Sequence, residues 1–296
     1  MAKRGRAEPT PCDIAASRRW LVRVVACVSM AVGGCGGISV RTEELPPDGC
    51  LVRSDEFLVL ENDGRLWGYA PATAKLRLVG QAGCPGVAYA ALAAMASGDA
   101  YVADVDGQIF HVSDRLACDG PVFGSPSFDT FWGMTQFVND EGAESVEFTE
   151  YDPSVNVDAD RLGSIDLATG NRTSGPLIAG QRLPIEPASG DDGRLFAVNM
   201  GNYATQKSLV EIDPTTGATK SERPFGAGIS SGSAGLARSG DYVYAFVASG
   251  SESASTFRFD VDGGAGVELG HLPIVVVGAG SSSCAASREQ AAGGSD

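Results

Sequence analysis

A turn phrase that recurs at a fixed distance constrains the fold of this 296-residue chain more than any other feature. In each copy, an aspartate ends an alternating apolar segment and a glycine follows a few residues later. The phrase occurs at Asp166–Gly170 and Asp213–Gly217, 47 residues apart, and Asp260 follows after another 47 residues. Aspartate accepts hydrogen bonds from nearby backbone N–H groups in such turns, and glycine adopts the left-handed conformation. A period in the forties built of short strands predicts a β-propeller, in which each repeat forms one blade.

A second phrase supports short antiparallel strands. Asp-Gly stands ahead of an alternating apolar run at Asp63–Trp67, Asp106–Phe110 and Asp192–Phe196, and this pattern is a hairpin signal. Together the two phrases predict an all-β chain and a propeller of five blades. A six-bladed ring and a β-sandwich stay open as alternatives, although a sandwich would not need the fixed period.

We expect each blade to hold an inner strand of small residues, two amphipathic strands and a polar outer strand. The predicted strands of blade 4 are 187–192, 194–200, 208–213 and 218–224, and those of blade 5 are 235–240, 242–247, 256–260 and 267–272. Blade 1 supplies only 56–60, 65–69 and 75–79 and lacks an inner strand. We expect Ile274–Val277 to fill that place, because closing the ring with the C-terminal strand removes an exposed sheet edge.

The segment Tyr89–Ala96 is the least typical of the predicted strands. It is rich in alanine and leucine, which favour a helix by intrinsic propensity. We assign it instead to the inner strand of blade 2, because small residues suit strands that crowd around the axis of a propeller.

The N-terminus has the features of an export leader. Basic residues precede an apolar run of nine residues, Val24–Val32, which is far shorter than the roughly 20 residues needed to span a bilayer. The next residues, up to Cys35, resemble the lipobox of bacterial lipoproteins, which implies lipidation of Cys35 and cleavage before it. A second match ending at Cys27 is disfavoured, because Arg23 leaves almost no apolar run ahead of it. Ser17–Leu21 also resembles a twin-arginine signal, so the export route stays open.

These boundaries predict a simple domain organisation. Residues 1–34 form the signal peptide, 35–49 a tether, 50–284 the propeller and 285–296 a disordered tail. Gly36 follows Cys35, where an aspartate holds some lipoproteins in the inner membrane, so an outer-membrane destination is favoured. The chain carries a net charge of −15, and nucleic acid is therefore excluded as a partner. We expect contact with the membrane only through the lipid on Cys35.

Four further cysteines lie beyond Cys35: Cys50, Cys84, Cys118 and Cys284. An even number in an exported protein indicates two disulfides. Cys84 follows the predicted outer strand of blade 1 and Cys118 begins that of blade 2, so neighbouring blades should bring them together. Cys50 precedes blade 1 and Cys284 follows the closing strand, so their disulfide should lock the ring. Free thiols remain an alternative, whereas a metal site is disfavoured because no pair of cysteines is spaced CxxC.

No catalytic constellation emerges from the sequence. Two histidines, His111 and His271, are too few to argue for a Ser-His-Asp arrangement. Five-bladed glycosidases use paired carboxylates near the axis, and Asp104, Glu147 and Glu211 are candidates in such an acidic chain. Two aspartate pairs, in Asp104–Gly107 and Asp260–Gly263, lack the further ligands of a calcium loop and are predicted to be hairpin turns. No cofactor and no metal site are predicted.

The repeats, the cysteine pattern and the ending Val277–Cys284 (VGAGSSSC) resemble a group of uncharacterised lipoproteins common in myxobacteria. The resemblance implies a propeller fold and a location in the cell envelope, and it carries no known activity. The sequence therefore predicts a lipid-anchored, non-catalytic propeller that binds an unidentified ligand or protein. The alternative is a five-bladed carbohydrate-active enzyme of the envelope.

Overall fold

The computed structural model describes ten stretches of the chain: residues 49–84, 87–123, 131–138, 144–151, 160–178, 185–190, 192–199, 207–225, 232–248 and 253–281. The regular secondary structure in these stretches is β-strand. They contain no helix of the length and apolar character that crossing a membrane requires. The predicted signal peptide, the lipidated Cys35 and the tail all lie outside the described residues, as does nearly all of the tether.

In the described stretches, twenty strands form five antiparallel four-stranded sheets, which we number as blades 1 to 5. Blade 1 contains β20 (Val276–Ser281), β1 (Phe57–Glu61), β2 (Arg65–Ala70) and β3 (Lys75–Gln81). Blade 2 contains β4 (Tyr89–Ala94), β5 (Ala100–Asp104), β6 (Ile109–Val112) and β7 (Cys118–Phe123). Blade 3 contains β8 (Phe131–Val138), β9 (Glu144–Tyr151), β10 (Asp160–Asp166) and β11 (Arg172–Leu177). Blade 4 contains β12 (Ile185–Ser189), β13 (Leu195–Asn199), β14 (Ser208–Ile212) and β15 (Thr219–Pro224), and blade 5 contains β16 (Ala234–Ser239), β17 (Tyr242–Ala248), β18 (Ala254–Asp260) and β19 (Gly263–Leu272).

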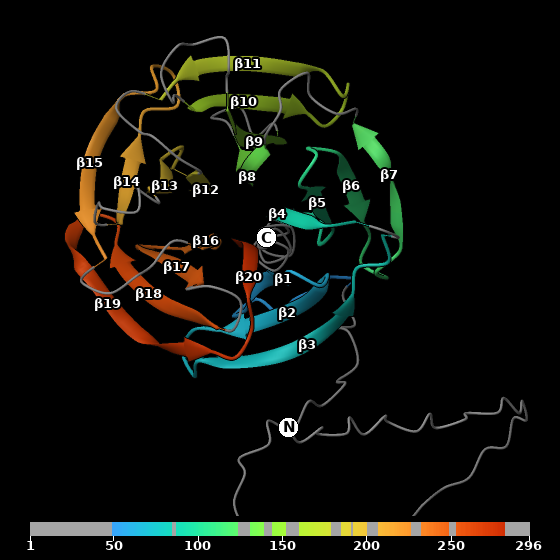
Figure 1. Cartoon of the computed structure of the whole chain (residues 1–296), viewed down its shortest axis with the longest axis horizontal. Helices are drawn as coiled ribbons and strands as arrows, with labels where there is room; N and C mark the ends of the chain where they lie inside the picture. The colour runs from blue at the N-terminus through green and yellow to red at the C-terminus, as the bar shows by residue number, and fades with distance from the viewer. Residues whose placement is uncertain are drawn as a thin grey trace, which may run out of the picture. The chain divides into compact units, whose positions relative to one another are not determined.

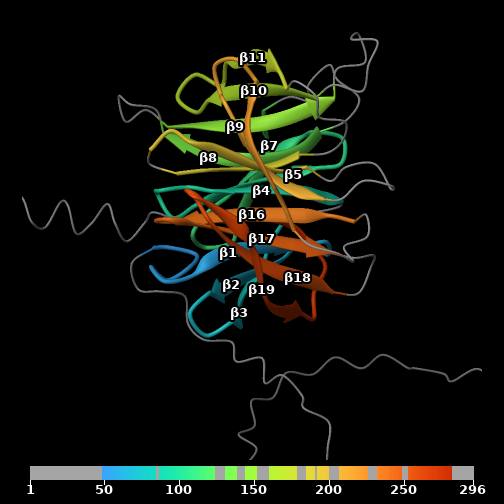
Figure 2. The same cartoon turned by 90° about the vertical axis from the view of Figure 1, so that its left-hand side faces the viewer.

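The five sheets are arranged in a closed ring, which confirms the predicted five-bladed propeller. The first strand of each sheet lies at the centre, and each of these inner strands contacts two others in the order β20, β4, β8, β12, β16 and back to β20. Figure 1 shows this ring along its axis, with β3, β7, β11, β15 and β19 at the rim. Figure 2 shows the sheets from the side, where strands of successive blades form layers.

The C-terminal strand closes the ring, as expected. β20 pairs with β1 over nearly its whole length, from Phe57 opposite Ser281 to Glu61 opposite Val276. The predicted closing segment Ile274–Val277 was placed too early, because β20 begins only at Val276. The alternate residues of β20 after Val276, Gly278 and Gly280, are small enough to let this strand lie close to β4 at the axis.

The inner strands pack more closely than ordinary side chains permit. An added Cβ at Gly278 would lie 2.6 Å from the backbone nitrogen of Leu92 on β4, and one at Gly235 would lie 2.7 Å from the Gly278 carbonyl carbon. The prediction that Tyr89–Ala96 forms an inner strand is confirmed for 89–94. Ala91 and Ala93 there are fully buried, so alanine is selected by space rather than by helix propensity.

Hydrogen bonds between inner strands show that these strands run in the same direction. Ser189 donates its hydroxyl to the Gln136 carbonyl oxygen, and the Glu186 carboxyl lies against Gly133. A step of three residues along β12 therefore matches a step of three residues along β8 in the same direction. β16 and β20 behave alike, because Ser233 donates to the Val276 carbonyl and the Arg238 N–H donates to Ser281 Oγ. Since parallel strands begin at the same side of a ring, we call this side the entry face.

The recurrent turns have the predicted construction. The Asp166 carboxylate accepts hydrogen bonds from the N–H groups of residues 168 and 169, and Asp213 does the same for residues 215 and 216. Gly170 and Gly217 adopt φ values of 70° and 71°. The aspartate–glycine turns that recur every 47 residues therefore connect the two outermost strands of these blades.

Candidate functional site

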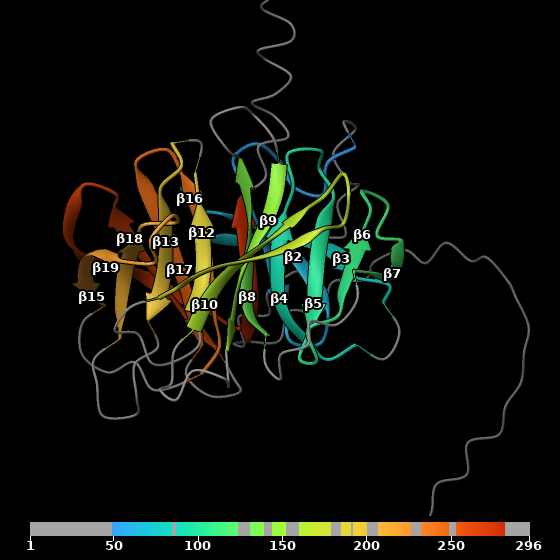
Figure 3. The ribbon, with the colours of Figure 1, turned by 90° about the horizontal axis from the view of Figure 1, so that it is seen from above.

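Polar side chains gather between the inner parts of blades 3 and 4, which we call the blade 3/4 seam. Among the described residues, apolar clusters fill the other four blade interfaces. The cluster at the seam is small and lacks aromatic residues: Leu162, Ile178, Leu195, Ala197, Val210 and Ile212. Figure 3 shows β8 and β12 side by side where these blades meet.

The polar character of the seam comes from the alternation of β9. Val146 and Phe148 point toward blade 2, where they join a core cluster. The intervening residues Ser145, Glu147 and Thr149 therefore point toward blade 4. Period-2 alternation thus directs Glu147 on β9 into the seam, and a second acid, Glu186 on β12, reaches the seam with its carboxyl group at Gly133.

Glu186 is the most unusual side chain of the seam. It is only 6% exposed, and it makes no hydrogen bond or ion pair with the described residues. An added Cβ at Gly133 would lie 2.5 Å from its Oε2 atom and 2.8 Å from its carboxyl carbon. Gly133 therefore leaves the space that the carboxyl group occupies.

The pairing of β12 locates this carboxyl near the axis. Glu186 pairs with Val198, whose side chain belongs to the core between blades 4 and 5. Its carboxyl nevertheless reaches Gly133 of blade 3. Because β13 occupies one edge of β12, the side chain crosses the other edge, which is the free edge that faces the axis.

Burial controls the electrostatics of both acids. It raises the pKa of Glu186 well above the ordinary value of a glutamate. It also raises the pKa of Glu147 to about 7, although a hydrogen bond from the Ser145 hydroxyl opposes the shift. Both carboxyl groups are therefore able to hold a proton at a pH where ordinary glutamates are ionised.

The other two carboxylates named from the sequence have structural partners. Asp104 accepts hydrogen bonds from the N–H groups of Asp106 and Gln108, and from the Gln108 side chain. This is the hairpin turn expected for the first aspartate pair. Glu211 accepts two hydrogen bonds of 3.0 Å from Arg194, which lower its pKa. The structure therefore does not bring Asp104, Glu147 and Glu211 together as one site.

A cluster of arginines stabilises the contact of blades 4 and 5. The guanidinium groups of Arg194, Arg223 and Arg238 lie 5.1–5.6 Å from the ring centre of Phe196. Arg238 forms an ion pair with Asp192, whose pKa is lowered to about 2 by this bond. Because Arg194 and Arg238 are paired with carboxylates and Arg223 donates to backbone carbonyl oxygens, the cluster connects blades rather than offering free charge.

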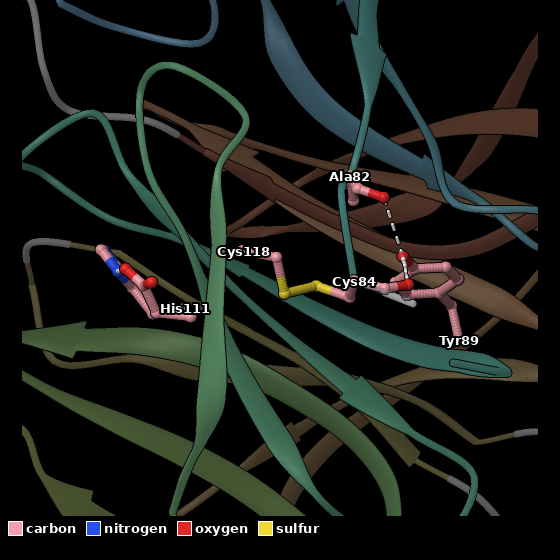
Figure 4. Close-up of a disulfide and its surroundings, with 6 residues drawn as sticks. Ala82, Cys84, Tyr89, His111 and Cys118 are labelled. Carbon is pink, nitrogen blue, oxygen red and sulfur yellow. Dashed lines mark hydrogen bonds and ion pairs between the residues drawn. A yellow bond between two sulfur atoms is a disulfide. The ribbon is translucent and has the colours of Figure 1, made fainter. Parts of the chain in front are cut away.

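The predicted Cys84–Cys118 disulfide is present and joins blades 1 and 2, with a Cα–Cα distance of 5.1 Å. Figure 4 shows the bond next to Tyr89, whose hydroxyl lies 3.1 Å from the Ala82 carbonyl oxygen and 3.3 Å from that of Cys84. His111 lies on the other side of Cys118 in the same view and contacts Asp99 at 3.1 Å. A disulfide of this kind indicates an extracytoplasmic location.

The second predicted disulfide stays a prediction. Cys50 is disulfide-bonded, and since Cys84 is paired with Cys118, a Cys50–Cys84 bond is excluded. Its expected partner, Cys284, lies outside the described residues, as does the lipidation site Cys35. The sequence analysis missed Glu186, because the predicted inner strand began at residue 187 whereas β12 begins at Ile185; an acidic residue directly beside a predicted inner strand, where small residues are expected, is the signal that could have identified it.

Comparisons with known proteins show distant similarity of fold. No family model matches the sequence, and no curated protein sequence matches it. Hydrazine synthase of Kuenenia stuttgartiensis is 14% identical over 80% of this chain and 70% of that chain, with a TM-score of 0.45. A chain of a nidogen/laminin complex is 11% identical over 77% of this chain and 99% of that chain, with a TM-score of 0.48. Xylan β-1,4-xylosidase of Bacillus halodurans C-125 is 17% identical over 59% of this chain and 41% of that chain, with a TM-score of 0.44. The assignment as a five-bladed propeller rests on the strand pairing, and fold alone gives no activity.

Proposed function

We propose that this chain is a lipid-anchored protein of the bacterial cell envelope whose propeller is a non-catalytic binding module. The proposal that the propeller is non-catalytic is supported by the pKa values of its acidic side chains. Hydrolysis by paired carboxylates needs one ionised and one protonated group. Burial instead raises the pKa of both Glu147 and Glu186, and neither has a basic partner among the described residues that would favour its ionised form over that of the other.

The anchor is supported by the sequence and by the disulfide. The leader resembles that of bacterial lipoproteins up to Cys35, and the Cys84–Cys118 bond suits an exported protein. The resemblance to myxobacterial lipoproteins agrees with both. Lipid on Cys35 would hold the propeller at the membrane surface through the tether of residues 35–49, leaving the blades accessible to a partner.

The anchor is tested with a matched pair of variants expressed in a bacterial host. Cys35→Ser should release the protein from the membrane fraction and should lower its mass by the lipid. Cys27→Ser, which alters the disfavoured lipobox match, should leave both unchanged. A Cys35→Ser variant that stays membrane-bound at unchanged mass would contradict the anchor.

The alternative, a carbohydrate-active enzyme, is favoured by one observation, the presence at the same seam of the buried Glu186 and the partly buried Glu147. We expect the wild-type protein to release no reducing ends from soluble envelope polysaccharides or plant xylans between pH 5 and 8. Release of sugars that is lost in both Glu147→Gln and Glu186→Gln, but kept in the exposed control Glu268→Gln, would establish the enzyme and overturn the binding module.

A further inference from the structure

The burial of Glu186 without a partner is not explained by packing in the core. Moving an ionised carboxylate into the protein interior costs several kcal/mol unless a partner compensates it. The other buried acids with raised or lowered pKa have partners in the described structure, such as Trp67 for Glu61 and Arg77 for Glu56. Glu186 is 6% exposed and has none, and only a glycine at position 133 leaves the space that its carboxyl occupies.

Backbone oxygen atoms face the same axial region. Each inner strand is paired on one edge only, and the Gln136 carbonyl accepts from Ser189 across the free edge of β8. Carbonyl groups of alternate residues point to the same edge of a strand, so the Met134 carbonyl also faces the axis. Met134 follows Gly133, and its carbonyl is therefore at the height of the Glu186 carboxyl.

We propose that the axial end of the blade 3/4 seam binds a small hard cation, with the Glu186 carboxylate as its anionic ligand and axial backbone carbonyls as neutral ligands. A carboxylate together with carbonyl oxygens is the donor set that calcium and similar cations prefer. The cation enters from the entry face, where β12 begins only one residue before Glu186. The site goes beyond the proposed function, because a bound cation is compatible with a binding module and with an enzyme.

The Glu186 carboxylate would balance one positive charge of the cation. Burial raises the pKa of this carboxyl, so protons compete with the cation for it. On the blade 4-facing side of β8 and β9, Glu147 is the one ionisable residue among those whose side chains the structure describes. β12 contributes none besides Glu186, and Val198 faces it from β13.

The test is calorimetric titration of the detergent-solubilised mature protein with calcium chloride at pH 7. We expect one saturable site per chain. Glu186→Gln should lose this binding, and Glu186→Asp should weaken it. Glu268→Gln removes the same charge from an exposed position on β19 and should bind as the wild type does.

Thermal unfolding in sodium, potassium, magnesium and calcium chlorides at equal ionic strength identifies which cation is preferred. A stabilisation by one of these salts that is absent in Glu186→Gln supports the site. The proposal is wrong if none of the four stabilises the wild type more than this variant. It is equally wrong if calcium binds Glu186→Gln as it binds the wild type. If Glu186→Gln does not fold, Glu186→Asp decides the question, and calcium affinity equal to that of the wild type contradicts the site.

Discussion

Replacing Glu147 by glutamine should change how the stability of the propeller depends on pH. Below about pH 4.5 the carboxyl is protonated in the folded and unfolded states, so it makes no difference to the free energy of unfolding. Between pH 4.5 and about 7 the unfolded state loses the proton while the folded state keeps it. The folded state therefore binds more protons, and the free energy of unfolding falls as the pH rises. Above about pH 7 the loss is complete and constant.

The magnitude follows from the shift. Each pKa unit corresponds to about 1.4 kcal/mol, and the pKa rises from 4.5 to about 7, so the loss is at most about 3 kcal/mol. Glutamine cannot ionise and avoids this loss. Relative to the wild type, the Glu147→Gln variant should therefore gain up to about 3 kcal/mol between pH 4 and pH 8. The Ser145 hydroxyl can still donate to the side-chain oxygen of the glutamine.

Urea unfolding at four or five pH values measures this difference directly. Glu186 is present in both proteins, so its own effect cancels when the variant is compared with the wild type. The variant Glu268→Gln, altered at an exposed position, controls for the loss of one negative charge. A difference between Glu147→Gln and wild type that stays constant within about 0.5 kcal/mol, the scale of the extrapolation error, from pH 4 to pH 8 would refute the assignment of a buried, proton-holding carboxyl.

Three further predictions concern the packing of the ring. Replacing both Cys84 and Cys118 by serine should lower the free energy of unfolding by about 4 kcal/mol, since the disulfide closes a loop across a sequence separation of 34; a urea midpoint equal to that of the oxidised wild type would contradict this. Gly278→Ala should destabilise the protein by about 2 kcal/mol or more, because the new methyl group meets the backbone of β4; wild-type thermal stability would show that the inner strands are not in contact. Asp192→Asn should cost about 1 kcal/mol at pH 7, since it breaks the ion pair with Arg238, and this cost should disappear as the pH falls from about 4 to about 2, where the wild-type carboxylate is itself protonated.

The repeated turns made the fold predictable. A turn such as Asp213–Gly217 depends on local chemistry, an aspartate carboxylate accepting from two N–H groups and a glycine at positive φ. The residues that make such a turn can be recognised in the sequence, and the spacing between turns then indicates the length of one blade. The disulfide between Cys84 and Cys118 followed from the same logic, because it requires only the order of strands in neighbouring blades.

The candidate site was less predictable, because it depends on contacts between blades. Among the carboxylates suspected from the sequence, Asp104 is held by N–H groups of its own turn, whereas Glu211 and Glu147 differ in what the neighbouring strands present to them. Arg194, directly before β13, reaches Glu211 on β14, whereas the described residues of blade 4 present no basic group to Glu147. Glu186 was not suspected at all, since its position depends on a side chain that crosses a strand edge toward Gly133.

The pairing of β1 with β20 also governs when the molecule can fold. During synthesis β1 emerges early, yet the strand that covers its free edge is among the last described segments of the chain. Contacts between residues so distant in sequence form slowly, because loop-closure entropy must be overcome before they add stability. Until β20 arrives, blade 1 exposes an unpaired edge that can pair with other chains. Ending translation shortly before Val276 should therefore yield aggregates rather than a four-bladed ring.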